Sequence, residues 1–279
     1  IRRTANIILN MKKITIILTV AVLFLISCSQ EKKLAQRFVE ASQGAKVALF
    51  VPNMLIKNNL RDDTIPTELD TLSNDEKIAY LEKQIKVINK IDDTKFIDIL
   101  YFSMGRELRA YGLDVEYWNT DSLPADTTRW IIDIPKIEVT EFVDYQRAAT
   151  RFYDEVVYAT VPVDVVNVAT WFNLGDAFTT ETAFVEQNYS NDFDGYFDVD
   201  ANGKLYAKIF ADSIDLDGFY RFATMLGKLY AGYCFDYLMN NYIDLNVAPE
   251  AADTVNRFRY DPYERYFFKT ENDRLTPLK

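Results

Sequence analysis

Acidic and amide side chains crowd one short turn in the second half of the chain. Asp198, Asp200, Asn202 and Gly203 match the first half of a calcium loop, in which oxygen ligands alternate along a tight turn. The position that supplies a bidentate acid in such loops is Ile209 here. The same residues suit a β-hairpin, since Asn-Gly readily adopts the backbone of a two-residue turn. The hairpin is the preferred interpretation, and calcium titration would separate the two.

Paired carboxylates are the second arrangement that could do chemistry. Asp133, Glu138 and Glu141 fall on one predicted strand, and two acids across a cleft can hydrolyse a glycosidic bond. Plain alternation puts Asp133 and Glu141 on one face. However, the apolar pattern shifts by one residue at Pro135, which predicts a bulge between them. With 42 acids in the chain, coincidental pairs are also expected.

The usual nucleophile and base pairs are missing from this composition. The chain has no histidine, which removes His-based triads, His zinc sites and the commonest general base. Ser103 falls within a predicted helix and lacks the elbow motif of a hydrolase. Cys234 lies between two aromatic residues on another predicted helix, where a buried, inert thiol is expected. We therefore predict no catalytic residue and a protein that is not an enzyme.

Basic and aromatic residues alternate near the C-terminus. The candidates for partner binding are Arg257, Arg259, Tyr260, Tyr263 and Tyr266. One interpretation is a segment strapped over the core, and the other is a strand that docks a protein, since Tyr and Arg are enriched at interfaces. Deleting residues 249–279 separates them. Lost thermal stability would indicate a strap, and lost partner capture with intact folding would indicate docking.

The N-terminal segment predicts where the protein resides. Met11 is followed by two Lys and by an apolar run from Ile14 to Ile26. A secretory signal has this order, and the run is shorter than the ~20 residues that a membrane-spanning helix needs. Residues 1–10 precede Met11 and are interpreted as a mis-assigned upstream extension.

Leu25-Ile26-Ser27-Cys28, where the apolar run ends, resembles a bacterial lipobox. The resemblance implies a signal peptide over 11–27 and a covalent lipid on Cys28, followed by a tether and short helix over 28–45. The residue after Cys28 is Ser29 and not Asp, and in this the chain is similar to lipoproteins that are released to the outer membrane. The few acids in the residues that follow Cys28 favour an anchor that faces the periplasm.

Charge and cysteine count limit the partners and the cofactors. Removal of four basic residues with the signal segment takes the formal charge from −11 to −15, which argues against nucleic acid as a partner. The same charge does not help binding to anionic lipid, so the lipid on Cys28 must supply the anchoring. Cys234 is then the one remaining thiol, and no intramolecular disulfide is expected. No cofactor is predicted beyond the covalent lipid.

Apolar spacing predicts an α+β fold, with a largely antiparallel sheet covered on one face by helices, including a long C-terminal helix. We expect a single domain over 46–248 and an extended tail over 249–279. Ala223, Gly227 and Ala231 lie four residues apart and predict a close approach of the long helix to the sheet. The predicted helices are 31–41, about 76–88 behind a Ser73–Glu76 capping box, 94–112 and 215–242; the predicted strands are 46–51, 113–118, 130–142, 154–172 with a break at Pro162, and a hairpin around Asn202-Gly203.

In order and pattern, segment 46–242 resembles the auxiliary lipoproteins of ABC-type and MCE-type envelope lipid-transport systems. The lipobox and general style resemble lipoproteins of Bacteroidota. No residue role other than that of Cys28 follows from either resemblance. The first hypothesis is a non-enzymatic, outer-membrane-anchored accessory subunit of an envelope assembly, with envelope proteins as partners and lipid transport as the candidate process. The alternatives are a lipoprotein that holds glycan or lipid between sheet and helix, and a carboxylate-pair hydrolase.

Overall fold

The computed structural model describes residues 30–61, 73, 76, 85–118, 130–152, 155–176, 179–247 and 255–278. The chain divides into two compact units. The larger comprises Gln43–Leu238 and Asp273–Lys279, and the smaller comprises the residues up to Ser42 and Met239–Asn272. In the described ranges no helix is both long and apolar enough to cross a membrane.

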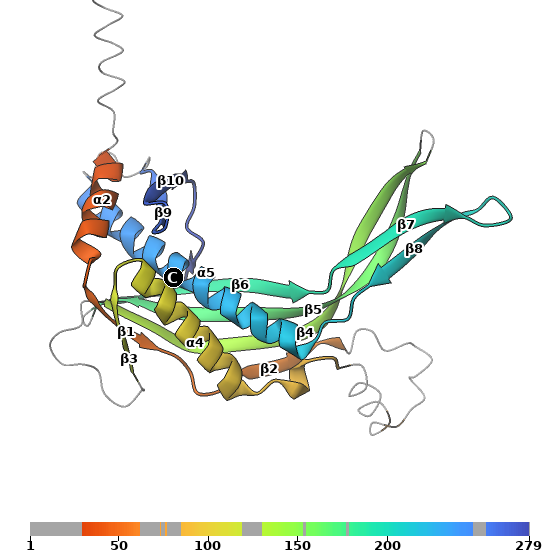
Figure 1. Ribbon diagram of the computed structural model, residues 1–279, viewed down its shortest axis with the longest axis horizontal. Helices are drawn as coiled ribbons and strands as arrows, with labels where there is room; N and C mark the ends of the chain where they lie inside the picture. The colour runs from red at the N-terminus through yellow and green to blue at the C-terminus, as the bar shows by residue number, and fades with distance from the viewer. Residues whose placement is uncertain are drawn as a thin grey trace, which may run out of the picture. The chain divides into compact units, whose positions relative to one another are not determined.

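The larger unit is built on a mixed sheet with the strand order β11-β6-β5-β4-β1-β3, and β2 pairs with β4 as well (Figure 1). Strand β1 is parallel to β3 and β4, and β2 is parallel to β4. The pairs β4–β5, β5–β6 and β6–β11 are antiparallel. The α+β class and the mostly antiparallel sheet are thus confirmed. The strand bounds are β1 Lys46–Phe50, β2 Ile56–Asn59, β3 Asp114–Tyr117, β4 Trp130–Phe152, β5 Glu155–Gly175, β6 Thr180–Ser190 and β11 Thr276–Pro277.

Helices α4 (Asp93–Ala110) and α5 (Leu216–Asn246) lie along one face of this sheet (Figure 1). The Asp92 side chain accepts a hydrogen bond from the backbone N–H of Lys95 at the start of α4, and Gly112 ends the turn after it with φ +94°. The predicted apolar stripes are buried: Phe96 of α4 stacks on Phe219 of α5 at 5.0 Å between ring centroids. The core therefore lies between the two helices and the sheet.

Gly227 makes a different close approach from the one that its spacing predicts. A Cβ at this position would lie 2.5 Å from the carbonyl oxygen of Leu100 and 2.7 Å from the Cβ of Ser103. Both residues belong to α4, so the missing side chain at Gly227 allows α5 to pass close to α4. The expected contact of Gly227 with the sheet is wrong, because helical spacing alone does not say which neighbour lies against the face.

Strands β4 and β5 form a long antiparallel pair. The register shifts between Asp133 and Lys136, which confirms the bulge predicted at Pro135. The predicted break at Pro162 is wrong, since β5 continues through it and Pro162 pairs with Tyr145. Strand β6 pairs with β5 only from Val165 onward, so Pro162 lies where β5 has one neighbour in the sheet and can turn its nitrogen outward.

The side of the β4–β5 pair that carries the buried apolar residues switches at Glu141. Before it, Ile137 and Val139 are fully buried on the helix-covered side. Beyond it, Val161, Val163 and Val165 on the opposite side form a buried cluster, against which Phe142 and Ile209 pack. Ile209 belongs to the hairpin of β7 (Phe193–Val199) and β8 (Leu205–Ala211), so this hairpin covers the second apolar side. The pair thus extends past the helices together with β7–β8 (Figure 1).

The smaller unit joins α2 (Gln30–Ser42), the last turns of α5 and the hairpin of β9 (Arg257–Asp261) and β10 (Tyr266–Thr270). The rings of Phe38 and Tyr242 lie 5.7 Å apart. The Asn240 side chain donates to the carbonyl of Phe258 at 3.1 Å and accepts from its N–H at 2.9 Å, which fixes β9 to α5. The described part of the predicted tail is therefore this hairpin followed by β11.

The predicted helix behind Ser73 lies mostly outside the described residues. Its capping box is present, since Glu76 accepts from the N–H of Ser73 at 2.9 Å and donates its own N–H to the Ser73 hydroxyl at 3.4 Å. Ile88, expected at its end, instead begins the 3₁₀ turn η3 (Ile88–Lys90).

Candidate functional site

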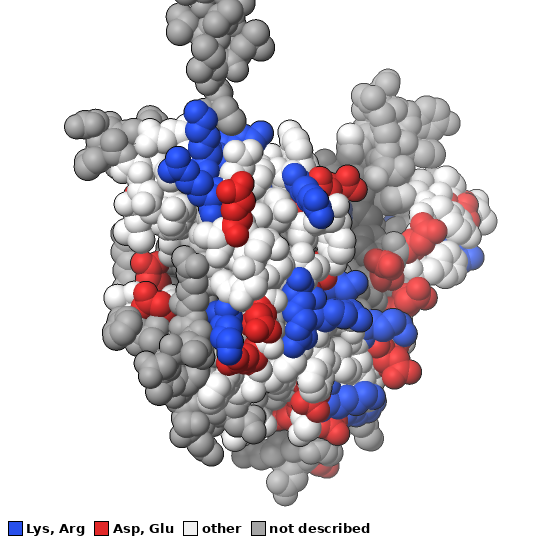
Figure 2. Space-filling model, turned by 60° about the vertical axis from the view of Figure 1, so that its left-hand side comes forward, with Lys and Arg blue, Asp and Glu red and all other residues white. Residues whose placement is uncertain are grey.

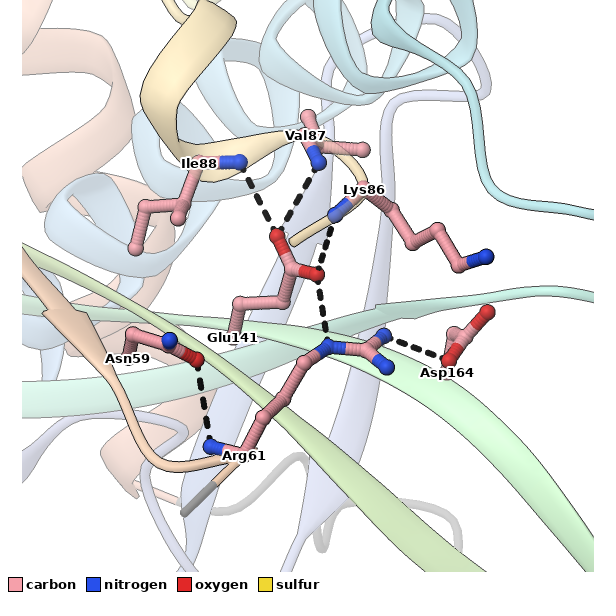
Figure 3. Close-up of polar contacts among 7 residues, drawn as sticks. All are labelled: Asn59, Arg61, Lys86, Val87, Ile88, Glu141 and Asp164. Carbon is pink, nitrogen blue, oxygen red and sulfur yellow. Dashed lines mark hydrogen bonds and ion pairs between the residues drawn. The ribbon is translucent and has the colours of Figure 1, made fainter. Parts of the chain in front are cut away.

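Glu141 is the centre of a buried ionic cluster (Figure 3). Its side chain is fully buried, and its carboxylate accepts from Arg61 Nε at 2.8 Å. The backbone N–H groups of Lys86, Val87 and Ile88 donate to the same carboxylate at 2.8, 3.0 and 2.9 Å. Each oxygen thus accepts two hydrogen bonds. Because four donors within the protein already bind its two oxygens, this carboxylate is poorly placed to attack a substrate or to take a proton from one.

Arg61 is the residue that the sequence did not reveal. Its guanidinium bridges Glu141 and Asp164 of β5, with Arg61 Nη2 2.5 Å from Asp164 Oδ1 (Figure 3). The backbone N–H of Arg61 donates to Asn59 Oδ1 at 3.1 Å. A buried acid requires a cationic or hydrogen-bonding partner, so the inward phase of Glu141 signals that one exists. Nothing in the local pattern shows that it comes from the end of β2. The cluster thus fixes the end of β2 and the segment before η3 to β4 at Glu141, where the buried side of the strand pair switches.

The other two candidate carboxylates face away from this cluster. Asp133 accepts from Asn173 Nδ2 at 2.9 Å. Glu138 pairs with Lys136 at 2.7 Å and accepts from Asn58 Nδ2 at 2.6 Å. Because of the bulge, Asp133 and Glu138 share the side of the sheet opposite the helices, whereas Glu141 points toward the helices. The three acids do not converge on one point.

Ser103 and Cys234 have structural surroundings. The Ser103 hydroxyl donates to the carbonyl of Thr224 at 2.8 Å, a bond between α4 and α5. Cys234 is buried, as predicted, and burial raises the pKa of its thiol well above the ordinary value. A thiol held in its protonated form is a poor nucleophile.

The turn of the β7–β8 hairpin confirms the Asn202-Gly203 prediction. Asp200 Oδ1 accepts from the N–H groups of Asn202 and Lys204 at 2.9 and 2.8 Å, and Gly203 has φ +79°. Asp198 accepts from the N–H of Val199 and, at 3.1 Å, from the hydroxyl of Tyr206. The candidate calcium ligands therefore serve the turn and the strand. Over the part of the chain that the structure describes, no group of three acidic, Cys or His side chains is arranged to hold a metal ion.

The outward side of β7–β8 presents a row of aromatic rings. Tyr196, Tyr206 and Phe210 share this side, with exposed fractions between 44% and 55%. Asp194, Asp198 and Lys208 lie among them on the same side. Acids outnumber bases both among these three residues and over residues 192–212, which hold five Asp and two Lys, so we call this surface the acidic aromatic face.

The C-terminal candidates divide between two sides of β9–β10. Arg259 and Tyr266 are exposed on the outward side, and Tyr263 is exposed in the turn. Tyr260 lies on the inward side, with its ring centroid 4.9 Å from that of Phe267. Arg257 shares the side of Arg259 and pairs with Asp244 of α5 at 2.9 Å. The segment thus combines the two interpretations, because Tyr260 and Arg257 are held within their own unit whereas Arg259, Tyr263 and Tyr266 are exposed.

Cys28 lies outside the described residues, and its lipidation stays a prediction. The chain matches no protein-family model and no curated protein. Among solved structures it is similar to a homologue of neuraminyllactose-binding hemagglutinin from Helicobacter pylori, at 10% identity, covering 73% of this chain and 90% of that one, with a TM-score of 0.30. A likeness at this TM-score carries no argument about function.

Proposed function

We propose that the chain is a non-enzymatic lipoprotein, anchored through Cys28 in the outer membrane and facing the periplasm, that serves an envelope assembly as an accessory subunit. The candidate process is lipid transport. The observation that carries the proposal is the acidic aromatic face of β7–β8. Aromatic residues are enriched at protein interfaces, and exposed apolar side chains that lie together on one surface are typical of an interaction site.

The hairpin is fixed well enough to act as a binding surface. Its inward side packs on the buried valines of β5 through Ile209, and the Arg61–Glu141 cluster holds the underlying strands. A partner would therefore meet rings that are already ordered, which lowers the entropic cost of association. The rings, with Asp194 and Asp198 on the same side, fit a partner segment that presents Lys or Arg.

The chemistry of the other candidate residues supports a role without catalysis. Glu141 has its acceptors occupied, Ser103 joins two helices, and Cys234 is buried with a raised pKa. The space between sheet and helices is filled by large side chains such as Phe172 and Tyr230, whose rings lie 5.3 Å apart. These features favour a binding surface on the outside of the protein.

Photo-crosslinking in intact cells tests the proposal. A photoreactive phenylalanine in place of Phe210 should give an adduct with a defined envelope protein. The same group in place of Phe102, an equally exposed residue on α4, is the matched control and should not. Equal adducts from both positions, or none from position 210, would contradict the proposal. Metabolic labelling with a fatty acid, lost in Cys28→Ser, tests the anchor separately.

Glycan binding by the same face is the second candidate. The observation in its favour is the carboxylate of Asp198 beside the ring of Tyr206, because sugars stack on rings and donate their hydroxyls to acids. Saturation-transfer NMR with envelope oligosaccharides, compared between the native chain and Tyr196→Ser, would support this candidate if the signal is lost in the variant.

A further inference from the structure

The smaller unit has a charge balance unlike that of the whole chain. Its described residues hold seven Lys and Arg against six Asp and Glu, whereas the full sequence holds 31 against 42. Asp244 is paired with Arg257, and Asp261 accepts from the N–H groups of Tyr263 and Glu264 in the hairpin turn. Figure 2 shows one face of the molecule, on which Lys and Arg side chains lie in groups with Asp and Glu side chains among them.

One side of β9–β10 places rings beside a guanidinium. Phe268 pairs in register with Arg259, and Tyr266 lies two residues away on the same strand and side. The Tyr266 and Phe268 rings are 4.8 Å apart and about half exposed. On the other side, Phe258 is buried and its ring meets Phe267 edge-on, so this is the packed side of the hairpin. Tyrosine, phenylalanine and arginine on an exposed surface are the side chains that settle at a lipid–water boundary.

This side of the hairpin lies next to the start of α2. Lys32 Nζ is 5.8 Å from the centre of the Tyr266 ring, and Asn256 Nδ2 donates to Glu31 at 3.2 Å. Helix α2 begins at Gln30, two residues after Cys28, and two residues of chain reach at most ~7 Å. A lipid on Cys28 would therefore bring this surface to the bilayer.

We infer that Arg259, Tyr266 and Phe268, together with Lys32 and Lys33 of α2, form a surface that binds an anionic lipid bilayer. We call it the basic aromatic face. Charges act on headgroups within about a Debye length, so the positive side chains of this face can bind them although the whole chain is strongly acidic. The inference rests on the proposed lipid on Cys28 for the orientation of the face. Beyond the lipid anchor, it assigns a direct contact with the membrane to side chains of the folded protein.

Vesicle binding without the lipid tests the inference. The mature chain carrying Cys28→Ser is sedimented with vesicles of phosphatidylcholine, alone or mixed with phosphatidylglycerol. Binding should require phosphatidylglycerol and fall as salt is raised. The double variant Tyr266→Ser/Phe268→Ser should bind about tenfold more weakly. Arg259→Ser should weaken binding about fivefold, and only on the anionic vesicles.

The acidic aromatic face provides the matched control. Tyr206→Ser/Phe210→Ser removes the same two ring types and should leave vesicle binding unchanged. Equal loss in both double variants, or no binding of the parent chain to anionic vesicles, would overturn the inference. Thermal melts identify a variant that fails to fold, and a photoreactive group at position 268 then replaces it; adducts with protein instead of lipid would also overturn the inference. Neither outcome depends on whether Cys28 is acylated or on what β7–β8 binds.

Discussion

The hairpins β7–β8 and β9–β10 each pack one side and expose aromatic rings on the other, but they differ in charge and in how they are held. Residues 192–212 contain five acids and two bases, whereas residues 255–272 contain four bases and three acids. Apolar contacts of Ile209 with the β5 valines hold the first, and the Asn240 side chain bonded to Phe258 holds the second. The difference is the basis of the two proposals, in which the first hairpin would bind a partner with cationic groups and the second would bind anionic headgroups.

The largest expected effect is loss of the ionic cluster beneath the first hairpin. Glu141→Gln should lower the free energy of unfolding by about 3 kcal/mol, because it leaves Arg61 buried with reduced compensation and turns an amide toward N–H donors. Glu138→Gln, on the open side of the same strand, should cost less than ~1 kcal/mol. Chemical denaturation measures both. Equal losses would mean that the cluster does not hold the strands.

Asn240 is the corresponding test for the second hairpin. Asn240→Ala should cost about 2 kcal/mol locally, since the buried N–H and carbonyl of Phe258 both lose their partner. Hydrogen exchange should become faster in β9 and β10, and binding to anionic vesicles should fall while crosslinking from position 210 persists. Asn246→Ala, which removes a bond within an exposed turn of α5, is the control and should change neither. Loss of both activities would show that the two hairpins do not act separately.

The local features of the fold could be predicted because nearby residues determine them. Asn202-Gly203 requires a turn, Gly112 ends a helix, and the phase shift at Pro135 requires a bulge. What could not be predicted depends on distant partners. Arg61 meets Glu141 only because β2 pairs with β4, and Gly227 faces α4 because of how two helices cross.

The candidate surfaces were predicted in the same partial way. The alternation of basic and aromatic residues after Arg257 indicated an amphipathic segment, but the sides of a strand cannot be ranked until one is seen to pack. The sequence pattern therefore does not single out Phe268, although it pairs with Arg259 on the exposed side. The sequence also does not show which side of β7–β8 is exposed. Ile209 packs on the valines of β5 because the buried side of β4–β5 changes at Glu141, and this change is a property of the assembled sheet.

A smaller effect separates the two sides of β7–β8. Ile209→Ala should cost about 1 kcal/mol, less than a fully buried deletion, because Ile209 is only partly buried against the β5 valines. Phe210→Ala, one residue along and on the outward side, should leave stability unchanged and weaken capture of the partner. Denaturation and crosslinking together distinguish them. If Phe210→Ala destabilises the protein as much as Ile209→Ala does, the outward ring has a structural role and the binding proposal loses its basis.

The smallest effect concerns the charge of the acidic aromatic face itself. The hydrogen bond from Tyr206 to Asp198, and the negative charge of that carboxylate, raise the pKa of Tyr206, because ionisation would break the bond and set two anions side by side. Asp198→Asn should therefore lower the pKa of Tyr206 toward its ordinary value, as measured by ultraviolet difference titration. Asp194→Asn, on the same side of β7, should leave it in place. A partner that supplies Lys or Arg to Asp198 should also lower this pKa when it binds, since an added cation favours the phenolate. A partner that leaves the pKa unchanged would show that its charge does not reach this carboxylate, and the proposed electrostatic fit would then be wrong.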